Sequence, residues 1–262
     1  MRRTFGTCLE VMSQTHRKYR AMISSDWNEC LAPCGPFDFI SFTYTSLDRE
    51  VNKIFRAYTG NEIPLSEATK RILSLLRSPI TEEQMDAYLD ERFETYRGLP
   101  ELIEWCEKKD ILFMINTTGM QGYFQRVFAK GLLPNVPVVS AHPMIKYEEQ
   151  GRTPCQWYDL LEIQDKPENT QKLLRAWGVP PEKAVLIGDS GGDGPHFEWG
   201  AKVGAFLIGS MTKWSLDQYC SEREIKISLH FGRCYSKGEK RNKAQEMDIN
   251  FMDLVPKIEA IL

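Results

Sequence analysis

Three short apolar runs, each ending in small or acidic polar residues, constrain the fold of this 262-residue chain more than any other feature. Residues 20–25 run into Asp26, residues 111–115 into Asn116-Thr117-Thr118, and residues 184–187 into Gly188-Asp189. Continuous apolar runs of this length are typical of strands that are buried on both faces of a parallel sheet. We therefore expect three buried strands whose carboxyl ends carry polar side chains.

Segments with helical spacing of apolar residues alternate with these runs. They are Leu99, Leu102, Ile103 and Cys106 before the second run, Phe124, Val127 and Phe128 after it, and Leu173, Leu174 and Trp177 before the third. Weaker strand candidates are residues 136–139, 203–208, 225–229 and 249–251. Strands that alternate with helices predict a Rossmann-like three-layer α/β/α core with a mostly parallel sheet.

The pattern changes to purely helical between residues 44 and 97. Val51, Ile54, Phe55 and Tyr58 follow the i, i+3, i+4, i+7 spacing of one helix face. Thr81 followed by Gln84 predicts a capping box at the start of a further helix. The sequence thus predicts an inserted all-helical cap at 44–97 and a core formed by 1–43 and 98–262. A cap beside the strand ends is well placed to act as a lid.

Charge and hydropathy exclude some classes of protein. The net charge of −3 and the isoelectric point near 5.9 argue against a general nucleic-acid-binding protein. A membrane span needs about 20 consecutive apolar residues, and the apolar runs here are far shorter. Met1-Arg2-Arg3 is followed by no apolar stretch of the kind that marks a secretory signal. We expect a cytoplasmic protein without a membrane partner; the oligomeric state is left open.

The seven cysteines indicate neither a disulfide framework nor a zinc site. Their number is odd and their spacing scattered: Cys8, Cys30, Cys34, Cys106, Cys155, Cys220 and Cys234. Cys30 and Cys34 are spaced CxxxC without a matching pair nearby, so we expect reduced, mostly buried thiols. The four histidines show no metal-ligand spacing, and His142 and His196 are expected to have packing or surface roles.

The polar strand ends form a set suited to phosphoryl transfer. In open α/β sheets, ligands bind beyond the carboxyl ends of the strands, where Asp26, Thr117 and Asp189 are expected. A helix that begins near residue 166 would add the ammonium of Lys166. Two carboxylates, a hydroxyl and an ammonium can provide a nucleophile, Mg²⁺ ligands and donors for phosphate oxygens.

The order of these residues resembles the haloacid dehalogenase-like (HAD) superfamily, and within it the phosphoserine phosphatase-like group with a helical cap. The matching segments are residues 113–120 (FMINTTGM) for motif two, 165–167 (DKP) for motif three and 185–193 (VLIGDSGGD) for motif four. The resemblance extends from about Tyr19 to about Ile208. It implies a Mg²⁺-dependent phosphatase that acts on a small phosphorylated metabolite through an aspartyl-phosphate intermediate.

The resemblance also implies roles for individual residues. Asp26 would attack phosphorus, while Thr117 and Lys166 would bind phosphate oxygens together with Thr118 and Gly119 of motif two. Thr118 is chemically as suitable as Thr117.

Four residues are implicated in metal binding by the same resemblance. Asp26, Asp189 and the backbone carbonyl of Asn28 would bind Mg²⁺, and Asp193, also counted among the metal residues, would orient water or Lys166.

Motif one departs from the family pattern DxDxT, because it reads Asp26-Trp27-Asn28-Glu29-Cys30. The amide of Asn28 replaces the carboxyl group that normally transfers a proton, a contribution worth about 10²–10⁴-fold in rate. Glu29 is a conceivable substitute. Three hypotheses therefore stay open: a phosphatase, a catalytically weak or inactive binding or regulatory protein, and a hydrolase of a bond other than a phosphate ester.

Other motif readings fail. Gly188-Asp189-Ser190-Gly191-Gly192 mimics the serine-protease nucleophile motif, but the helical periodicity of the chain contradicts an all-β protease fold. The sequence contains neither a GxxxxGK[ST] nor a GxGxxG phosphate-binding loop. The sequence names neither the substrate nor the residue that activates water.

Overall fold

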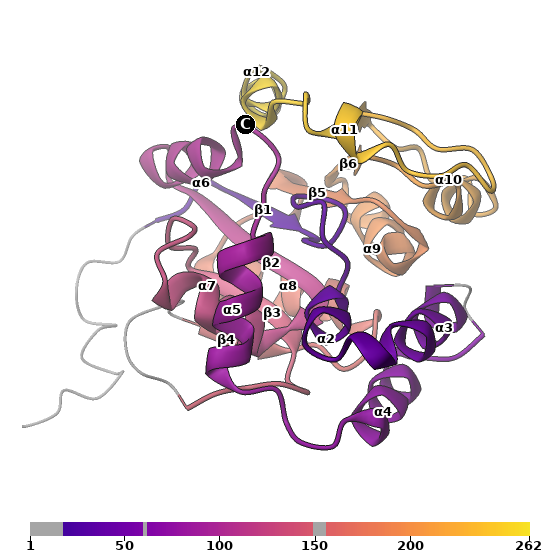
Figure 1. The fold of residues 1–262 in the computed structure, drawn as a ribbon. Coiled ribbons are helices and arrows are strands. Elements are labelled where there is room, and N and C mark those ends of the chain that lie inside the picture. The colour runs from indigo at the N-terminus through magenta and orange to yellow at the C-terminus, as the bar shows by residue number, and fades with distance from the viewer. Residues whose placement is uncertain (1–17, 60–61, 149–155) are drawn as a thin grey trace, which may run out of the picture.

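A parallel sheet forms the core of the computed structural model, which describes residues 18–59, 62–148 and 156–262 (Figure 1). Its strands are β1 (Ala21–Ser25), β2 (Ile111–Met120), β3 (Val138–His142), β4 (Gln156–Asp159), β5 (Ala184–Gly188), β6 (Phe206–Ser210) and β7 (Leu229–Phe231). Their order is β4-β3-β2-β1-β5-β6-β7, and all neighbouring strands are parallel. The predicted α/β core is confirmed.

The register of the three central strands brings their carboxyl ends together. Ser25 at the end of β1 pairs with Ile115 of β2 on one side and with Ile187 of β5 on the other. The residues that follow these partners are the polar ones of the sequence pattern. Strand β2 continues to Met120 beyond the predicted end at residue 115, but its pairing with β1 stops at Ile115, so Asp26, Thr117 and Asp189 lie at one edge of the sheet.

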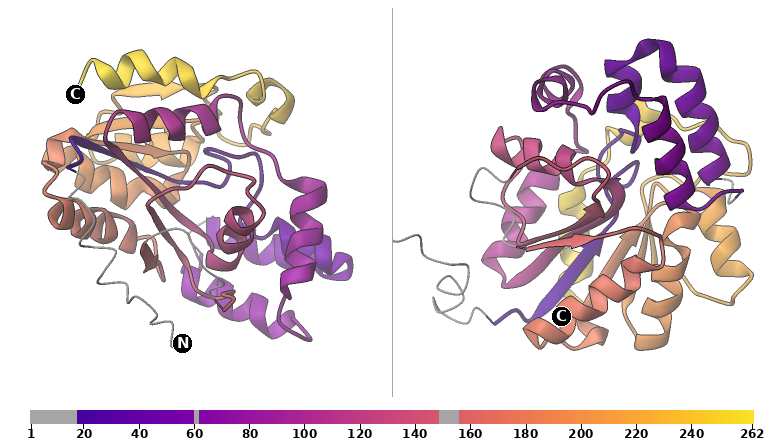
Figure 2. Two further views of the ribbon diagram at one scale, coloured as in Figure 1. Left: turned by 90° about the vertical axis from the view of Figure 1, so that its left-hand side faces the viewer. Right: turned by 90° about the horizontal axis from the view of Figure 1, so that it is seen from below.

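Helices cover both faces of this sheet (Figure 2). On one face, α6 (Leu99–Lys108), α7 (Gln121–Ala129) and α12 (Val255–Glu259) contribute to the larger apolar cluster. On the other face, α8 (Asp165–Trp177), α9 (Gly194–Val203) and α10 (Trp214–Ser221) pack in a second cluster around Met22, Leu112 and Leu186. A short helix, α11 (Lys243–Glu246), lies between β7 and α12 in sequence.

Four helices between β1 and α6 form the inserted module. They are α2 (Asp38–Thr43), α3 (Asp48–Thr59), α4 (Leu65–Leu75) and α5 (Glu82–Arg92). The capping box predicted at Thr81 is present, since Thr81 Oγ1 accepts from the Gln84 N–H and Gln84 Oε1 accepts from the Thr81 N–H. Helices α3, α4 and α5 lie within the range 44–97 predicted to be helical, whereas all of α2 lies before residue 44, in the range assigned to the core.

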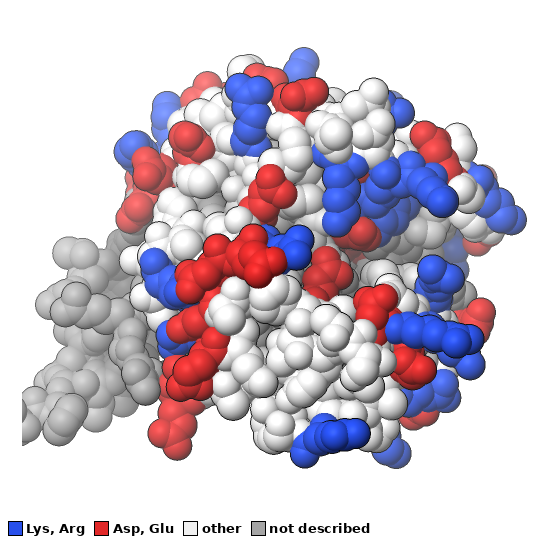
Figure 3. Space-filling model, viewed as in Figure 1, with Lys and Arg blue, Asp and Glu red and all other residues white. Residues whose placement is uncertain are grey.

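Ion pairs and a helix cap join this module to the core. Arg126 of α7 donates two hydrogen bonds to Asp86 of α5, at 2.8 and 2.7 Å, and a third to Glu82 at 2.5 Å. Glu162, ahead of α8, accepts the backbone N–H groups of Leu65 and Ser66 at the start of α4, both at 3.0 Å. Acidic side chains gather over α5 (Figure 3), where Arg126 partly neutralises them.

The weaker strand predictions have mixed outcomes. Residues 136–139 and 203–208 overlap β3 and β6, whereas β7 takes only Leu229 from the range 225–229. The strand predicted at 249–251 is wrong: Asn250 forms an isolated bridge with Arg97, and a 3-10 helix begins at Phe251. The sequence pattern also missed β4, because its four residues lie at an edge and are only partly buried.

Two other expectations concern the termini and cysteines. Cys30, Cys34, Cys106 and Cys220 are buried free thiols as expected, while Cys234 is free and exposed. The described residues do not include Cys8 or Cys155. They also do not include the N-terminal segment that was compared with a secretory signal. Within the described ranges, no helix is both long enough and apolar enough to cross a membrane.

Replacing Arg126 by lysine tests the joint between α5 and α7. Lysine keeps the charge but cannot donate the paired hydrogen bonds to Asp86, so we expect the free energy of unfolding to fall by about 1 kcal/mol. Urea denaturation measures this change. Arg71→Lys, at an exposed pair with Glu67, should leave stability within about 0.5 kcal/mol; equal losses in both variants would contradict the assignment.

Candidate active site

The edge formed by β1, β2 and β5 carries a compact cluster of buried polar groups. The carboxylates of Asp26 and Asp189 and the hydroxyl of Thr117 are 7%, 1% and 0% exposed. The backbone N–H of Asp26 donates to the carbonyl of Ile187 at 2.9 Å, which fixes the end of β1 against β5. The three strand ends predicted from the sequence thus meet at one place.

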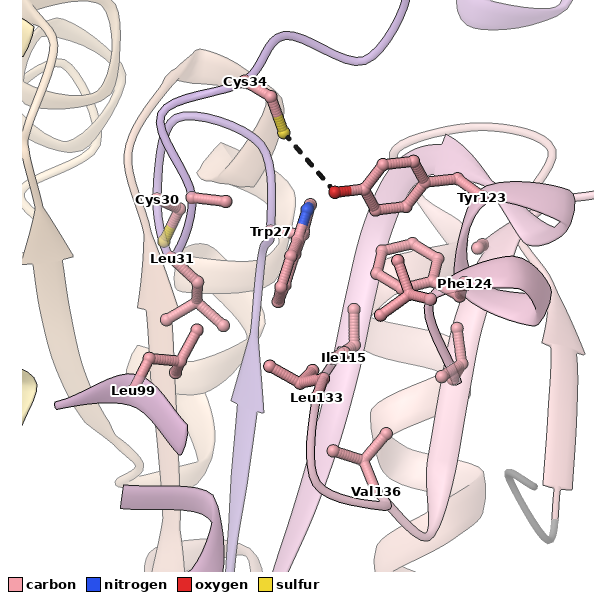
Figure 4. Close-up of a cluster of buried hydrophobic side chains, with 14 of the residues drawn as sticks. Trp27, Cys30, Leu31, Cys34, Leu99, Ile115, Tyr123, Phe124, Leu133 and Val136 are labelled. Atoms are coloured by element: carbon pink, nitrogen blue, oxygen red, sulfur yellow. Dashed lines mark hydrogen bonds between the residues drawn. The ribbon is translucent and has the colours of Figure 1, made fainter. Parts of the chain in front are cut away.

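The loop after β1 is anchored by Trp27, whose side chain is fully buried. Figure 4 shows the indole between the loop that carries Cys30 and the aromatic rings of α7. The Trp27 ring lies 5.4 Å from the Phe124 ring at 82°, an edge-to-face contact. Because Trp27 is held in the core, the flanking residues Asp26 and Asn28 are left to line the cleft at the strand ends.

Lys166 reaches this edge from the first turn of α8 and is 2% exposed. Asn116, which follows the last residue of β2 paired with β1, holds that turn by donating from Nδ2 to the backbone carbonyl of Lys166 at 2.9 Å and to Thr170 Oγ1 at 3.0 Å. The Lys166 ammonium donates to Asp26 Oδ1 at 3.1 Å and to Asp193 Oδ1 at 2.5 Å. These two carboxylates raise the pKa of Lys166 despite its burial, which keeps the ammonium charged.

Asp193 is the fixed partner of Lys166. Its second oxygen, Oδ2, accepts the backbone N–H groups of Asp189 at 2.9 Å and Ser190 at 3.3 Å. A side chain at position 188 would approach the Asp193 carboxyl group to 2.5 Å, so the turn requires Gly188. Both oxygens of Asp193 are therefore already bound, one by Lys166 and the other by the backbone of the turn.

Asp189 has the free ligand capacity that Asp193 lacks. Its Oδ2 lies 2.7 Å from the Lys213 ammonium, whereas its buried Oδ1 has no hydrogen-bond partner among the described residues. Burial and the nearby carboxylates, only partly offset by Lys213, raise the pKa of Asp189 to about 7. Burial likewise raises the pKa of Asp26 against the opposing effect of Lys166.

These carboxylates fit a hard divalent cation. Asp26, Asp189 and Asp193 each offer an oxygen within 4.8 Å of the others. Oxygen ligands of this kind suit Mg²⁺, and a cation would satisfy the unpaired Oδ1 of Asp189. The residues predicted for the metal therefore do lie together, with Asp26 and Asp189 better placed as ligands than Asp193.

Asn28 sits at the centre of motif one with both ends of its amide engaged. Its Oδ1 accepts from the Thr117 hydroxyl at 3.2 Å, and its Nδ2 donates to the Cys34 carbonyl at 3.4 Å. Thr117 Oγ1 in turn accepts the backbone N–H of Gly119 at 3.2 Å. Thr118, unlike Thr117, lines the open cleft, so the structure separates the two threonines that the sequence left as alternatives.

Glu29 is tied to two cations and does not face the cleft as a free acid. Lys213 donates to its Oε2, and Arg241 Nη1 lies 2.6 Å from its Oε1. Burial alone would raise the pKa of Glu29, but these two cations lower it to about 2. Glu29 also has a φ of 59°, a strained backbone conformation for this residue type.

The partners of Glu29 were not found by sequence reasoning. Lys213 follows β6, and Arg241 lies in the segment Ser236–Lys243, whose charged and polar residues are typical of a solvated loop. Arg241 also donates to Tyr96 Oη at 2.7 Å and to Glu246 Oε2 at 2.5 Å. Its side chain is only 12% exposed, because a buried carboxylate, Glu246, draws it inward.

A cleft opens above these groups, and α3 lines its far side. Phe55, Tyr58 and Thr59 of α3 line it opposite Asp26, Lys166 and Asp189. The Tyr58 hydroxyl is hydrogen-bonded to Thr118, and burial raises its pKa to about 12. Residues of α3 therefore form one wall of the candidate site.

The histidines take structural roles. His196 is 1% exposed and its Nε2 lies 2.9 Å from Thr170 Oγ1. Burial, with help from Lys166, lowers its pKa to about 3, so the ring is neutral. His142 Nδ1 accepts the backbone N–H of Met144 at 3.0 Å. Both agree with the packing roles favoured from the sequence.

Comparison with known proteins identifies the fold. No protein-family model and no curated protein sequence matches this chain. A substrate-bound phosphoserine phosphatase matches over 92% of this chain and 99% of its own, with 17% identity and a TM-score of 0.64. A phospho-aspartyl intermediate analogue of phosphoserine phosphatase matches over 92% and 99%, with 16% identity and a TM-score of 0.62.

A third similar structure is a HAD family hydrolase from Salmonella enterica subsp. enterica serovar Typhi. It shares 17% identity, with 94% of this chain and 73% of that chain covered and a TM-score of 0.65. The chain therefore has the fold of these phosphoserine phosphatases and of this HAD family hydrolase. At these identities the likeness establishes the fold, and the chemistry has to be argued from the residues.

A Glu29→Gln variant tests the ion-pair cluster. Since the folded-state pKa of Glu29 is lowered from 4.5 to about 2, its contribution to stability is present above pH 4.5 and is lost as the pH falls toward 2. We expect the variant to be about 2 kcal/mol less stable at pH 7. Urea denaturation from pH 7 to pH 2.5 should show this difference in stability shrinking. A difference that stays constant with pH would contradict the prediction, as would an equal loss of stability in the exposed control variant Glu94→Gln.

Proposed function

Since the chain has a phosphoserine-phosphatase-like fold, we propose that it is a Mg²⁺-dependent phosphatase of a small phosphorylated metabolite that works through an aspartyl-phosphate at Asp26. The observation that carries this proposal is the position of Asp26 at the cleft floor, with Lys166 3.1 Å from its Oδ1 and Asp193 holding Lys166 in place. An ammonium beside a carboxylate nucleophile can neutralise a phosphate that approaches it.

The phosphate would lie between Asp26 and the end of β2. Lys166 and Thr118 line this part of the cleft and can donate to phosphate oxygens. Thr117, whose hydroxyl points to Asn28, would bind phosphate only after giving up that contact. The phosphate set proposed here is thus Lys166 and Thr118 first, with Thr117 and Gly119 shaping the turn.

A divalent cation is supported by the charge of the cleft. Among the described residues around it, the carboxylates of Asp26, Glu29, Asp189 and Asp193 face only three cations, Lys166, Lys213 and Arg241. A phosphate dianion entering this surplus of negative charge would be repelled. Asp26, Asp189 and the Asn28 carbonyl would hold Mg²⁺, which supplies charge neutralisation for the phosphate oxygens.

The proposed reaction has two displacements at phosphorus. A carboxylate oxygen of Asp26 attacks, and the ester P–O bond breaks with its electron pair left on the departing oxygen. Water then attacks the aspartyl-phosphate, the bond to Asp26 breaks, and inorganic phosphate leaves while the water proton passes to solvent. Lys166 stays charged throughout and Asp193 keeps it aimed at the reacting phosphate.

The second candidate is a binding or regulatory protein, and Asn28 favours it. The amide cannot take the proton of the attacking water, and Glu29, which could have replaced it, is held by Lys213 and Arg241. Under the phosphatase proposal, the second displacement is therefore slow. Under the binding proposal, the first displacement does not occur either.

Burst kinetics separate the two candidates. With p-nitrophenyl phosphate and Mg²⁺, we expect about one equivalent of p-nitrophenol to be released rapidly, followed by turnover slowed roughly 10²–10⁴-fold for want of a base. Stopped-flow absorbance and acid-stable labelling of the protein with ³²P measure the two phases.

Two variants control this experiment. Asp26→Asn should abolish both burst and label, a loss of at least about 10³-fold, whereas Asp90→Asn, at an exposed carboxylate of α5 that pairs with Lys130, should keep both. The absence of a burst in a folded, Mg²⁺-binding wild-type protein would favour the binding protein.

Metal binding can be measured without turnover. At tenfold excess over its Kd, Mg²⁺ should stabilise the protein by about 1.4 kcal/mol and raise the Tm by about 4 °C. Asp189→Asn should remove most of this shift, because it weakens the one carboxylate with an unsatisfied oxygen. Differential scanning calorimetry measures this rise in Tm. The control variant Asp90→Asn should keep it. If Asp189→Asn also kept the full rise, the metal would bind elsewhere.

A further inference from the structure

The cleft has two chemically different parts. Its ionisable lining residues among the described ones, Asp26, Glu29, Lys166, Asp189 and Lys213, all lie at the core side and are paired with one another. Helix α3 contributes only uncharged residues to the described lining, namely Phe55, Tyr58 and Thr59, and the Tyr58 hydroxyl reaches Thr118 at the phosphate side. The part of a substrate that extends away from the phosphate would contact this uncharged wall.

This wall offers no partner for a charged group. A carboxylate or an ammonium buried without a partner loses several kcal/mol of solvation, and the lining described here has no unpaired charge to compensate. Phe55 and Tyr58 instead offer aromatic surface, on which a flat, uncharged ring would pack well. The leaving group that fits is therefore uncharged and aromatic rather than an amino acid.

Apart from Asp26, the proposed nucleophile, and Asp189, the proposed metal ligand, the described lining of the cleft offers no free carboxylic acid to the departing oxygen. Asn28 has an amide, both oxygens of Glu29 are bound by cations, and both oxygens of Asp193 are occupied. The Tyr58 hydroxyl is engaged by Thr118. An aliphatic alkoxide leaving such a site would depart unprotonated, which forfeits a factor of roughly 10²–10⁴. A phenolate spreads its charge over its ring and needs no proton to leave.

These two observations point to one class of substrate, and the inference rests on the proposed phosphatase function. We propose that the chain acts on phosphomonoesters of acidic hydroxyl groups on uncharged aromatic rings, with the ring packed against Phe55 and Tyr58. The Asp26 oxygen forms the new bond to phosphorus, and the aryl oxygen leaves with the electron pair of the broken P–O bond. Solvent protonates the phenolate after it departs.

A leaving-group series tests this inference. Burst rates of the wild-type protein are measured with para-substituted phenyl phosphates, phosphoserine and glycerol phosphate, all with Mg²⁺. We expect the rate to increase roughly fivefold or more for each unit by which the pKa of the leaving hydroxyl falls, and aryl esters to exceed alkyl esters by about 10²-fold or more. A flat series, or phosphoserine cleaved as fast as phenyl phosphate, would overturn the inference.

Two site variants tell whether the missing acid is the cause. Asn28→Asp restores a carboxyl group, so it should accelerate the alkyl esters by roughly 10²-fold and flatten the series. Tyr58→Phe should change KM but leave the slope of the series unaltered. A steeper slope in Tyr58→Phe would make its hydroxyl the leaving-group acid and overturn the inference.

The aromatic wall has its own matched pair of variants. Phe55→Leu should raise KM for phenyl phosphates roughly three- to tenfold while leaving the slope unchanged. Phe42→Leu removes an aromatic ring from the same module, where it packs on Tyr88 away from the cleft, and should leave KM unchanged. If Phe55→Leu and the wild type had equal KM, the aromatic ring of the substrate would not pack against Phe55 as proposed.

The outcomes also separate this inference from the function on which it rests. If no ester is cleaved, not even p-nitrophenyl phosphate, while Mg²⁺ still raises the Tm, the phosphatase proposal fails and this inference fails with it. If esters are cleaved without regard to the leaving group, the phosphatase proposal stands and only the substrate class is wrong.

Discussion

The ammonium of Lys166 is the interaction on which the rest of the site depends. Three buried carboxylates meet at the edge of β1, β2 and β5, and their mutual repulsion would be costly without a cation between them. Lys166 joins Asp26 to Asp193, and Asn116 holds the turn of α8 from which it extends. One helix N-terminus, two strand ends and the acidic turn after β5 are thereby locked into a single arrangement.

A second ion cluster lies beside the first and joins the end of the chain to its beginning. Glu29 binds Lys213 from the loop after β6 and Arg241 from the segment before α11, and Arg241 continues to buried Glu246. Because Lys213 also lies 2.7 Å from Asp189, this cluster sets the charge next to the proposed metal ligand. It also explains why Glu29 is unsuited to replace the proton-transferring group that Asn28 lacks.

Asn28 connects the chemistry of the site with its selectivity. A phosphatase without a proton donor at this position depends on the leaving group to carry its own charge, and the uncharged wall of α3 suits leaving groups that can. In this proposal, the uncharged lining from α3 and the missing acid at position 28 favour the same class of ester. The residue that weakens general catalysis becomes, in this proposal, one determinant of which esters are cleaved.

The sequence by itself determined the parallel core, the helical insertion and the residues at the three strand ends, because apolar periodicity and polar strand ends are local signals. It placed Asp26, Thr117, Lys166 and Asp189 correctly at one edge of the sheet. Only the tertiary structure decided the rest. The short strand β4 carries too weak a pattern, Lys213 and Arg241 resemble ordinary surface residues in sequence, and Tyr58 resembles an ordinary residue of an apolar helix face. Their roles arise from charges and aromatic rings brought together over long separations, which no local pattern encodes.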